Sequence, residues 1–215
     1  MRRSAFILTA CLFLVVGHAK GESKDKELKS YLDGVTERGR ALYAYDQAAW
    51  HGTDAFFEIK PDTNGLTKYI CLKAASGGVV SCGGRNSASD ELLIVYEAVE
   101  TGQHGHFVAH RLDPPREATD EQTAMEHALE LASADFQHPQ RPYNSAILPA
   151  PNGNFYVYYY PAQTKDTVWP IGGDVRYTLS PDGKQLIEKR QCTKRFSTWN
   201  INRVQTWLPA CTRMF

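Results

Sequence analysis

Three polar side chains that can take part in acid–base chemistry or ligand binding lie within one short stretch: Asp46, His51 and Asp54. Residues three apart meet on one surface of a helix, so His51 and Asp54 can act together. Asp46 falls on an apolar stripe, near Trp50 one turn further on. Either the three form a polar cluster in a cleft, or Asp46 is the buried partner of an arginine and His51–Asp54 is a fraying helix end. We favour the second interpretation.

Arg176 is a fourth candidate for ligand binding. It follows the pair Gly172-Gly173, and glycine lets the backbone approach a ligand closely because it has no side chain. The alternative, which we favour, is that Arg176 and Asp174 lie on a solvated strand face. The candidate binding residues are therefore Asp46, His51, Asp54 and Arg176. The sequence assigns no catalytic residue and no cofactor.

The histidines near residue 106 have the spacing of a metal site. His104, His106 and His110 would share one face of an extended strand, and histidines two apart on a strand often bind metals. However, His104 falls in a predicted turn, and no aspartate, glutamate or cysteine joins this face by sequence. We therefore expect surface histidines here and no metal ligands.

The first 19 residues predict a signal peptide. Arg2 and Arg3 are basic, residues 5–16 are apolar, and Gly17-His18-Ala19 has the small residues of a cleavage site. The apolar run is too short for a confident membrane span. We expect export to the periplasm or the outside of the cell, with no stable membrane span after cleavage.

Composition restricts the partners of the exported chain. Loss of Arg2 and Arg3 changes the formal net charge from 0 to about −2. So small a charge gives no electrostatic attraction to nucleic acid or to anionic membranes. We therefore expect no nucleic-acid partner, and the sequence identifies no other.

Export permits disulfide bonds, and one is predicted by strand register. Cys71 and Cys82 flank a natural hairpin in which Leu72 faces Ser81, so the two cysteines face each other directly. Opposed Cβ atoms in an antiparallel pair are close enough for a disulfide. Cys192 and Cys211 would by default be the remaining pair, but we do not expect them to pair, for a reason that concerns the residues after Gln191 and is given below.

Hydrophobic periodicity predicts the elements that position these residues. Apolar residues at steps of three and four predict a helix over 22–55. A capping box from Thr119 to Gln122 starts a second helix, which ends near Phe136. Predicted strand pairs are 69–74 with 79–82, 91–100 with 106–112, 143–148 with 155–160, and 174–179 with 186–190.

These elements predict an α+β fold in a single domain over residues 20–191. An antiparallel sheet of hairpins packs against the long N-terminal helix and the second helix, with the helices on one side. Gly183 ends the turn Ser180-Pro181-Asp182-Gly183, where it takes a positive φ. The aromatic run over 155–160 can stack sugars or nucleobases, but we expect it to pack against a helix.

Residues from about Arg38 to Gln191 resemble a group of uncharacterised secreted bacterial proteins. The resemblance is carried by Arg40–Trp50, with the sequence Arg-Ala-Leu-Tyr-Ala-Tyr-Asp-Gln-Ala-Ala-Trp, and by the hairpin over Gly172–Gln191. In that group, the strand after the turn continues through Arg-Gln to His-Lys, and a His-Thr-His motif follows further on. This chain has neither feature after Gln191.

The genetic code offers an explanation for that difference. Codons chosen for the residues after Gln191, translated one base earlier, give Met-His-Lys-Thr-Ile-Leu-Asp-Val-Glu, which alternates like a strand, and restore His-Thr-His near the end. We therefore predict that residues 192–215 are an atypical tail, out of frame and truncated. The gene sequence tests this prediction, since codons incompatible with the second frame would contradict it.

Two functions follow as hypotheses. The first is an exported, non-catalytic module that binds a small ligand, a glycan or a protein, because no nucleophile–base pair or phosphate loop emerges from the sequence. The alternative is a truncated relative of a metal-dependent hydrolase. The lost His-x-His motif resembles half of the metal site of JAMM-type metalloproteases, in which two histidines and a carboxylate hold zinc.

Overall fold

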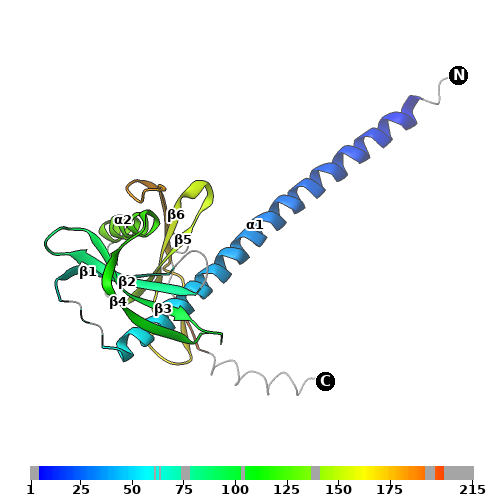
Figure 1. Cartoon of the computed structure of the whole chain (residues 1–215). Coiled ribbons are helices and arrows are strands. Elements are labelled where there is room, and N and C mark those ends of the chain that lie inside the picture. The colour runs from blue at the N-terminus through cyan, green and yellow to red at the C-terminus, as the bar shows by residue number, and fades with distance from the viewer. Residues whose placement is uncertain are drawn as a thin grey trace, which may run out of the picture. The chain divides into compact units, whose positions relative to one another are not determined.

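The computed structural model describes residues 5–60, 62, 64–73, 78–102, 105–136, 141–191 and 197–200. It confirms the α+β fold: a long N-terminal helix, a second helix and antiparallel sheets (Figure 1). The helices are α1 (Ala5–Glu58) and α2 (Asp120–Asp135), with a 3₁₀ turn at Pro151–Gly153. The strands are β1 (Leu66–Lys73), β2 (Val79–Asn86), β3 (Leu92–Glu100), β4 (Phe107–Glu117), β5 (Tyr143–Pro149), β6 (Phe155–Pro161), β7 (Val168–Ile171), β8 (Val175–Leu179), β9 (Leu186–Gln191) and β10 (Ser197–Asn200).

The chain divides into two compact units, Met1–Ala44 and Tyr45–Phe215. In the first unit, α1 is longer than predicted because it begins at Ala5 rather than near residue 22. Lys29 and Asp33, one turn apart and both exposed, form an ion pair of 3.0 Å on its surface. Within the described residues, no helix is long and apolar enough to cross a membrane. The signal peptide over residues 1–19 and the export of the chain stay predictions.

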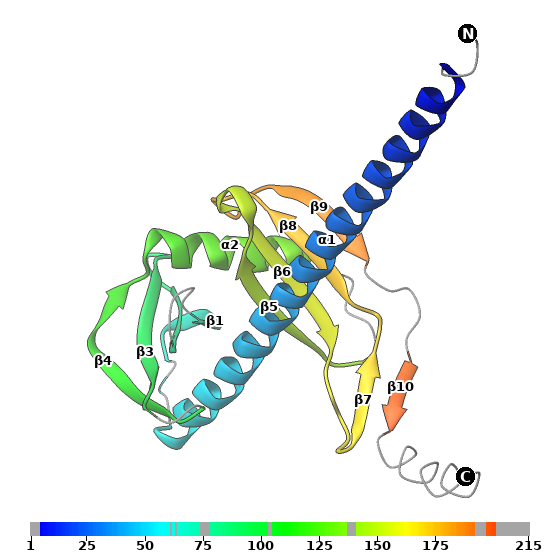
Figure 2. The same ribbon diagram turned by 90° about the vertical axis from the view of Figure 1, so that its right-hand side faces the viewer.

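The second unit holds two four-stranded antiparallel sheets and a two-stranded ribbon (Figure 2). The first sheet has the strand order β1-β2-β3-β4, and the second has the order β5-β6-β8-β9. The ribbon pairs β7 with β10. The sequence predicted a loop where β7 lies.

The two helices approach opposite faces of each sheet. The sequence had predicted both helices on one side of a sheet. In the first sheet, Val80 of β2 contacts Gly52 of α1. The neighbouring Ser81 hydrogen-bonds to Arg116, which donates to Gln122 of α2. Since successive side chains on a strand point to opposite faces, the two helices lie on different faces of this sheet.

The second sheet is arranged in the same way, because its long tyrosines alternate between the helices. Tyr160 of β6 hydrogen-bonds to Asp46 of α1, whereas its neighbour Tyr159 stacks on Phe136, with ring centroids 4.2 Å apart and an interplanar angle of 7°. Phe136 is the C-cap of α2, whose N-terminus carries the predicted capping box of Thr119 and Gln122. The aromatic strand thus packs against helices, as predicted.

The first hairpin has the predicted register. Cys71 lies opposite Cys82, Leu72 lies opposite Ser81, and the two cysteines form a disulfide. Cys82 is fully buried, in a core cluster with Val80, Phe56 and Tyr96. The predicted Cys71–Cys82 bond is therefore confirmed, and it joins β1 to the core-facing side of β2.

β4 continues past the point where the sequence predicted its end. Asp113-Pro114-Pro115 was expected to stop the strand, yet β4 runs to Glu117. Tyr96 pairs with Arg111 and Ile94 with Arg116, so the prolines lie in an irregular segment between two paired stretches. Proline has no backbone N–H, but in this unpaired segment its absence breaks no hydrogen bond between β3 and β4.

The predicted atypical tail is described only in part. β9 ends at Gln191, and Ser197–Asn200 form the short strand β10, with Trp199 opposite Trp169 of β7. The residues of β10 do not alternate between apolar and polar as a strand usually does. The strand therefore depends on its pairing with β7. Cys192 and Cys211 lie outside the described residues, and the frameshift stays a prediction.

Tyr45 of α1 connects the two sheets. Its hydroxyl hydrogen-bonds to the backbone at Lys73 of β1 and at Ile147 of β5, and its side chain is buried. Burial is the main reason that the pKa of Tyr45 rises from 10.0 to about 12. The phenol therefore resists ionisation more strongly in the folded state than in the unfolded chain.

We expect this tyrosine to make the protein sensitive to alkali. A raised folded-state pKa contributes stability that is fully present below pH 10 and is lost as the pH rises towards 12. The free energy of unfolding of the wild type minus that of Tyr45→Phe should therefore fall by about 2 kcal/mol between pH 8 and pH 11.5. Urea unfolding of both proteins at the two pH values measures this difference. A constant difference would show that Tyr45 ionises normally.

Candidate functional site

The four residues singled out by sequence lie in different surroundings. Asp46 accepts a hydrogen bond of 2.8 Å from the Tyr160 hydroxyl. Burial, together with this carboxylate, raises the pKa of Tyr160. The partner of Asp46 is thus a tyrosine, where the favoured interpretation expected an arginine.

His51 and Asp54 lie near the end of α1, beside the first sheet. The His51 ring stacks on Trp50, with centroids 4.8 Å apart, and lies against Gly105, where an added Cβ would come within 3.3 Å. Asp54 is exposed. His106 and His110 are also exposed, and His106 Nδ1 hydrogen-bonds to the Thr101 hydroxyl at 2.7 Å. His104 lies outside the described residues.

Arg176 belongs to the second sheet. Its guanidinium donates to Glu188 of β9 at 2.6 Å and lies over the Tyr156 ring, 4.7 Å from the centroid. The hydrogen bond to Arg176 lowers the pKa of Glu188. The structure therefore brings Asp46 and Arg176 to one sheet and leaves His51 and Asp54 at the other, with no hydrogen bond or ion pair between these four. Their role in binding stays a prediction.

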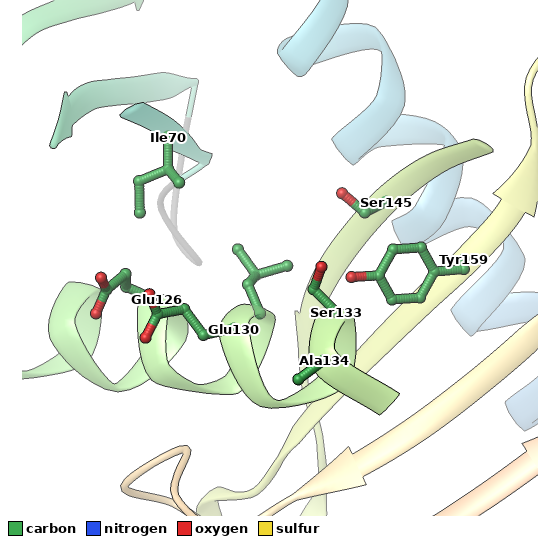
Figure 3. Close-up of a pocket in the computed structure, with 8 residues that line it drawn as sticks. Ile70, Glu126, Glu130, Ser133, Ala134, Ser145 and Tyr159 are labelled. Atoms are coloured by element: carbon green, nitrogen blue, oxygen red, sulfur yellow. The ribbon is translucent and has the colours of Figure 1, made fainter. Parts of the chain in front are cut away.

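A cavity of about 520 Å³ lies along α2, where none of these four residues is found (Figure 3). Ile70 of β1 lines it on one side, and Ser145 of β5 and Tyr159 of β6 line it on the other. Between them lies the face of α2 that carries Glu126, Glu130 and Ser133. Both sheets and the helix therefore contribute walls.

One end of the cavity is acidic. Glu126 and Glu130 lie one turn apart on α2, with their carboxylates at the same end (Figure 3). Glu126 is 1% exposed, and Arg85 of β2 binds both of its oxygens, with Nε at 2.8 Å from Oε1 and Nη2 bonded to Oε2. This hydrogen bond is the main reason that the pKa of Arg85 is raised.

Arg85 is itself held by its neighbours. Its Nη1 donates to the backbone carbonyl of Asp90 at 2.7 Å, and its Nη2 lies 3.5 Å from Nε2 of His127. A charge-assisted bidentate pair of this kind fixes both partners in one geometry. The Glu126 carboxylate is therefore a rigid part of the cavity wall.

The other end of the cavity carries hydroxyl groups. Ser133, Ser145 and Tyr159 present their oxygens towards the same space (Figure 3). Tyr159 hydrogen-bonds to Ser133, and burial raises its pKa. Leu129, Ala134 and Ile70 add apolar surface to the walls.

The described lining can hold a ligand through polar groups in fixed positions and apolar surface between them. In the described part of the chain, the lining contains hydrogen-bonding groups at both ends and no cysteine, lysine or histidine. Among the residues that the structure describes, no three histidine, cysteine, aspartate or glutamate side chains come together as a metal site. What remains is a cavity of ligand size with polar groups in fixed positions.

The sequence contained a partial signal for this site. Glu126 follows the buried Met125 and lies two residues before the fully buried Ala128, so a charge falls within the buried part of α2. Arg85 ends the glycine-rich run of β2 and is the complementary charge. Their pairing joins residues 41 apart, and no local period predicts it.

Comparison of the chain with protein-family models, with curated proteins and with solved structures finds no match. The resemblance to secreted bacterial proteins therefore stays a prediction, and the geometry of the cavity is the basis for assigning a function.

Proposed function

We propose that the protein is an exported, non-catalytic binding module that takes a small ligand in the cavity along α2. The observation that carries this proposal is the cavity itself, with about 520 Å³ of space and a mixed apolar and polar lining. Ligand sites in proteins commonly have volumes of about 300–1,000 Å³ and a few fixed polar groups in apolar surroundings. The predicted signal peptide and the disulfide support a role outside the cytoplasm.

The lining favours a small amphiphilic ligand over a long glycan or a protein segment. Arg85 already binds both oxygens of Glu126, so a ligand amine or hydroxyl at the acidic end would bond to the remaining lone pairs of the carboxylates, since each carboxylate can accept about four hydrogen bonds. Ile70 and Leu129 offer apolar contact, and the hydroxyl groups at the other end can donate or accept. A molecule with an apolar middle and a polar group at each end fits this order of surfaces.

The cavity can be filled from its rim without disturbing the core. Ser145 is exposed at the cavity, so Ser145→Trp should place an indole into the space and weaken ligand binding at least tenfold. Asn144→Trp is the matched control. Asn144 is also exposed, lies next in β5, and points to the opposite face of the strand.

Saturation-transfer NMR with a panel of short alkylamines, diols and alkyl glycosides provides the measurement. We expect at least one member to bind to the wild type and to Asn144→Trp, and to lose its signal with Ser145→Trp. Equal binding to both variants would place the ligand elsewhere. Failure of every member to bind at about 1 mM would contradict the proposal, since a cavity of this kind should give at least weak affinity.

A further inference from the structure

We propose that the ligand of the cavity along α2 is a short linear amino alcohol, held with its ammonium at the acidic end and its hydroxyl at the other. This ligand would occupy the site of the proposed function, so its assignment rests on that proposal. The α2 residues that line the cavity form a single stripe, because they are spaced three or four residues apart: Glu126, Leu129, Glu130, Ser133 and Ala134. A ligand that lies along this stripe meets both polar ends at once.

The acidic end favours a ligand group that only donates hydrogen bonds. A carboxylate only accepts them, and Glu126 and Glu130 present two carboxylates at this end (Figure 3). A ligand hydroxyl between them can donate to one carboxylate, but its own lone pairs then face the other. An ammonium has three donors and no acceptor, so it can bond to both carboxylates, and its charge strengthens each bond. The acidic end should therefore prefer an ammonium to a hydroxyl.

The hydroxyl end can donate a hydrogen bond to a ligand oxygen. Tyr159 and Ser133 hydrogen-bond to each other, so one of their two O–H groups donates within the pair and the other can donate to a ligand. Ser145 adds a third hydroxyl at the exposed rim. No lysine, arginine or histidine occurs among the described lining residues, so no cation there would compensate a ligand carboxylate. A neutral hydroxyl therefore suits this end better than a carboxylate.

The geometry of α2 sets the length of the ligand. Ser133 lies two turns after Glu126, which is about 10 Å along a helix axis. A hydrogen bond of about 2.8 Å at each end, inclined to the axis, leaves roughly 5–8 Å between the ligand nitrogen and oxygen. An extended chain advances by about 1.25 Å for each bond of about 1.5 Å, so about three to five methylene groups span this gap. Leu129 of α2 and Ile70 of β1 offer them apolar surface.

Isothermal titration calorimetry of the full chain at pH 7 tests the proposal with linear amino alcohols of two to eight carbons. Binding should be tightest at about three to five carbons and weaken at least fivefold at two and at eight. Burial of apolar surface alone would instead strengthen binding with every added carbon. The diol of the same length should bind at least tenfold more weakly, and the alkylamine without a hydroxyl at least threefold more weakly.

Two variants assign the ends of the ligand. Glu130→Gln keeps the shape of the side chain but removes its charge, so amino alcohols should bind at least tenfold more weakly while diols change less than threefold. Glu121→Gln is the matched control, because it makes the same charge change at an exposed position in the first turn of α2 and should bind like wild type. The double variant Ser133→Ala with Tyr159→Phe should bind an amino alcohol no better than the matching alkylamine. Thermal unfolding verifies that each variant is folded.

The outcomes separate this ligand class from the proposed function itself. Diols that bind as tightly as amino alcohols, affinity that rises steadily to eight carbons, or undiminished binding to Glu130→Gln would overturn the amino alcohol and leave the cavity as a ligand site. Binding of alkyl glycosides alone would do the same. If no amine, diol or glycoside binds at about 1 mM, both the ligand class and the proposed function are wrong.

Discussion

Replacement of Glu126 by glutamine is expected to lower the free energy of unfolding by about 3–5 kcal/mol. The change keeps the shape of the side chain but removes its charge. Arg85, which is 13% exposed, would then keep a nearly buried positive charge without its bidentate partner. Removing one member of a buried ion pair costs more than the pair contributes, because the remaining charge is left poorly solvated. Urea unfolding at pH 7 measures the change.

Asp90 provides a control on the same arginine. Its carboxylate lies 3.9 Å from Arg85 Nη1, but its side chain is 85% exposed. Asp90→Asn should change stability by less than about 1 kcal/mol, because exposed ion pairs contribute little. The double variant Arg85→Met with Glu126→Leu removes both charges, and we expect it to recover most of the stability lost in Glu126→Gln. Similar losses for Glu126→Gln and Asp90→Asn would show that Glu126 is not a buried ion-pair partner.

The second large effect is expected at Gly183, where alanine should cost about 3 kcal/mol or more. Gly183 has a φ of +73°, a conformation that costs a residue with a Cβ about 1–2 kcal/mol. An added Cβ would also lie 2.7 Å from the backbone nitrogen of Ala128 and closer still to the carbonyl oxygen of Ala124. Backbone atoms of a helix cannot move aside as a flexible side chain can, so the hairpin turn would have to leave α2.

Gly65→Ala separates the two contributions. Gly65 has a similar φ of +77°, but apart from its chain neighbours no atom of the described residues lies within 4 Å of its added Cβ. This variant should lose only the conformational part, about 1 kcal/mol. Thermal and urea unfolding of both variants give the comparison. Equal losses at Gly65 and Gly183 would mean that the turn is not packed against α2.

Local features of the sequence predicted a large part of the fold. The Cys71–Cys82 register, the capping box at Thr119 and the positive φ of Gly183 were predicted because each depends on residues close together in the chain. Periodicity located both helices and the strands of both four-stranded sheets. It missed β7 and β10, whose pairing joins distant segments with little alternation of their own.

The cavity could not be predicted in the same way. Its walls come from β1, α2, β5 and β6. The Arg85–Glu126 pair connects the first hairpin to α2, and these two elements were predicted separately. Sequence spacing directed attention to Asp46, whose partner proved to be Tyr160, 114 residues away. The sequence predicted a site on α1 because polar residues lie close together there in the chain. Tertiary packing instead places the ligand-sized cavity along α2.

The position of Tyr45 has a consequence for how α1 can vary. Tyr45 bonds to the edges of both sheets, and Phe56, about three turns later, lies against Tyr96 in the core of the first sheet. Inserting one residue between them would rotate one anchor by about 100° relative to the other. The spacing of this stretch is therefore constrained even where its surface residues are free to change, and length variation among related chains should be confined to the loops.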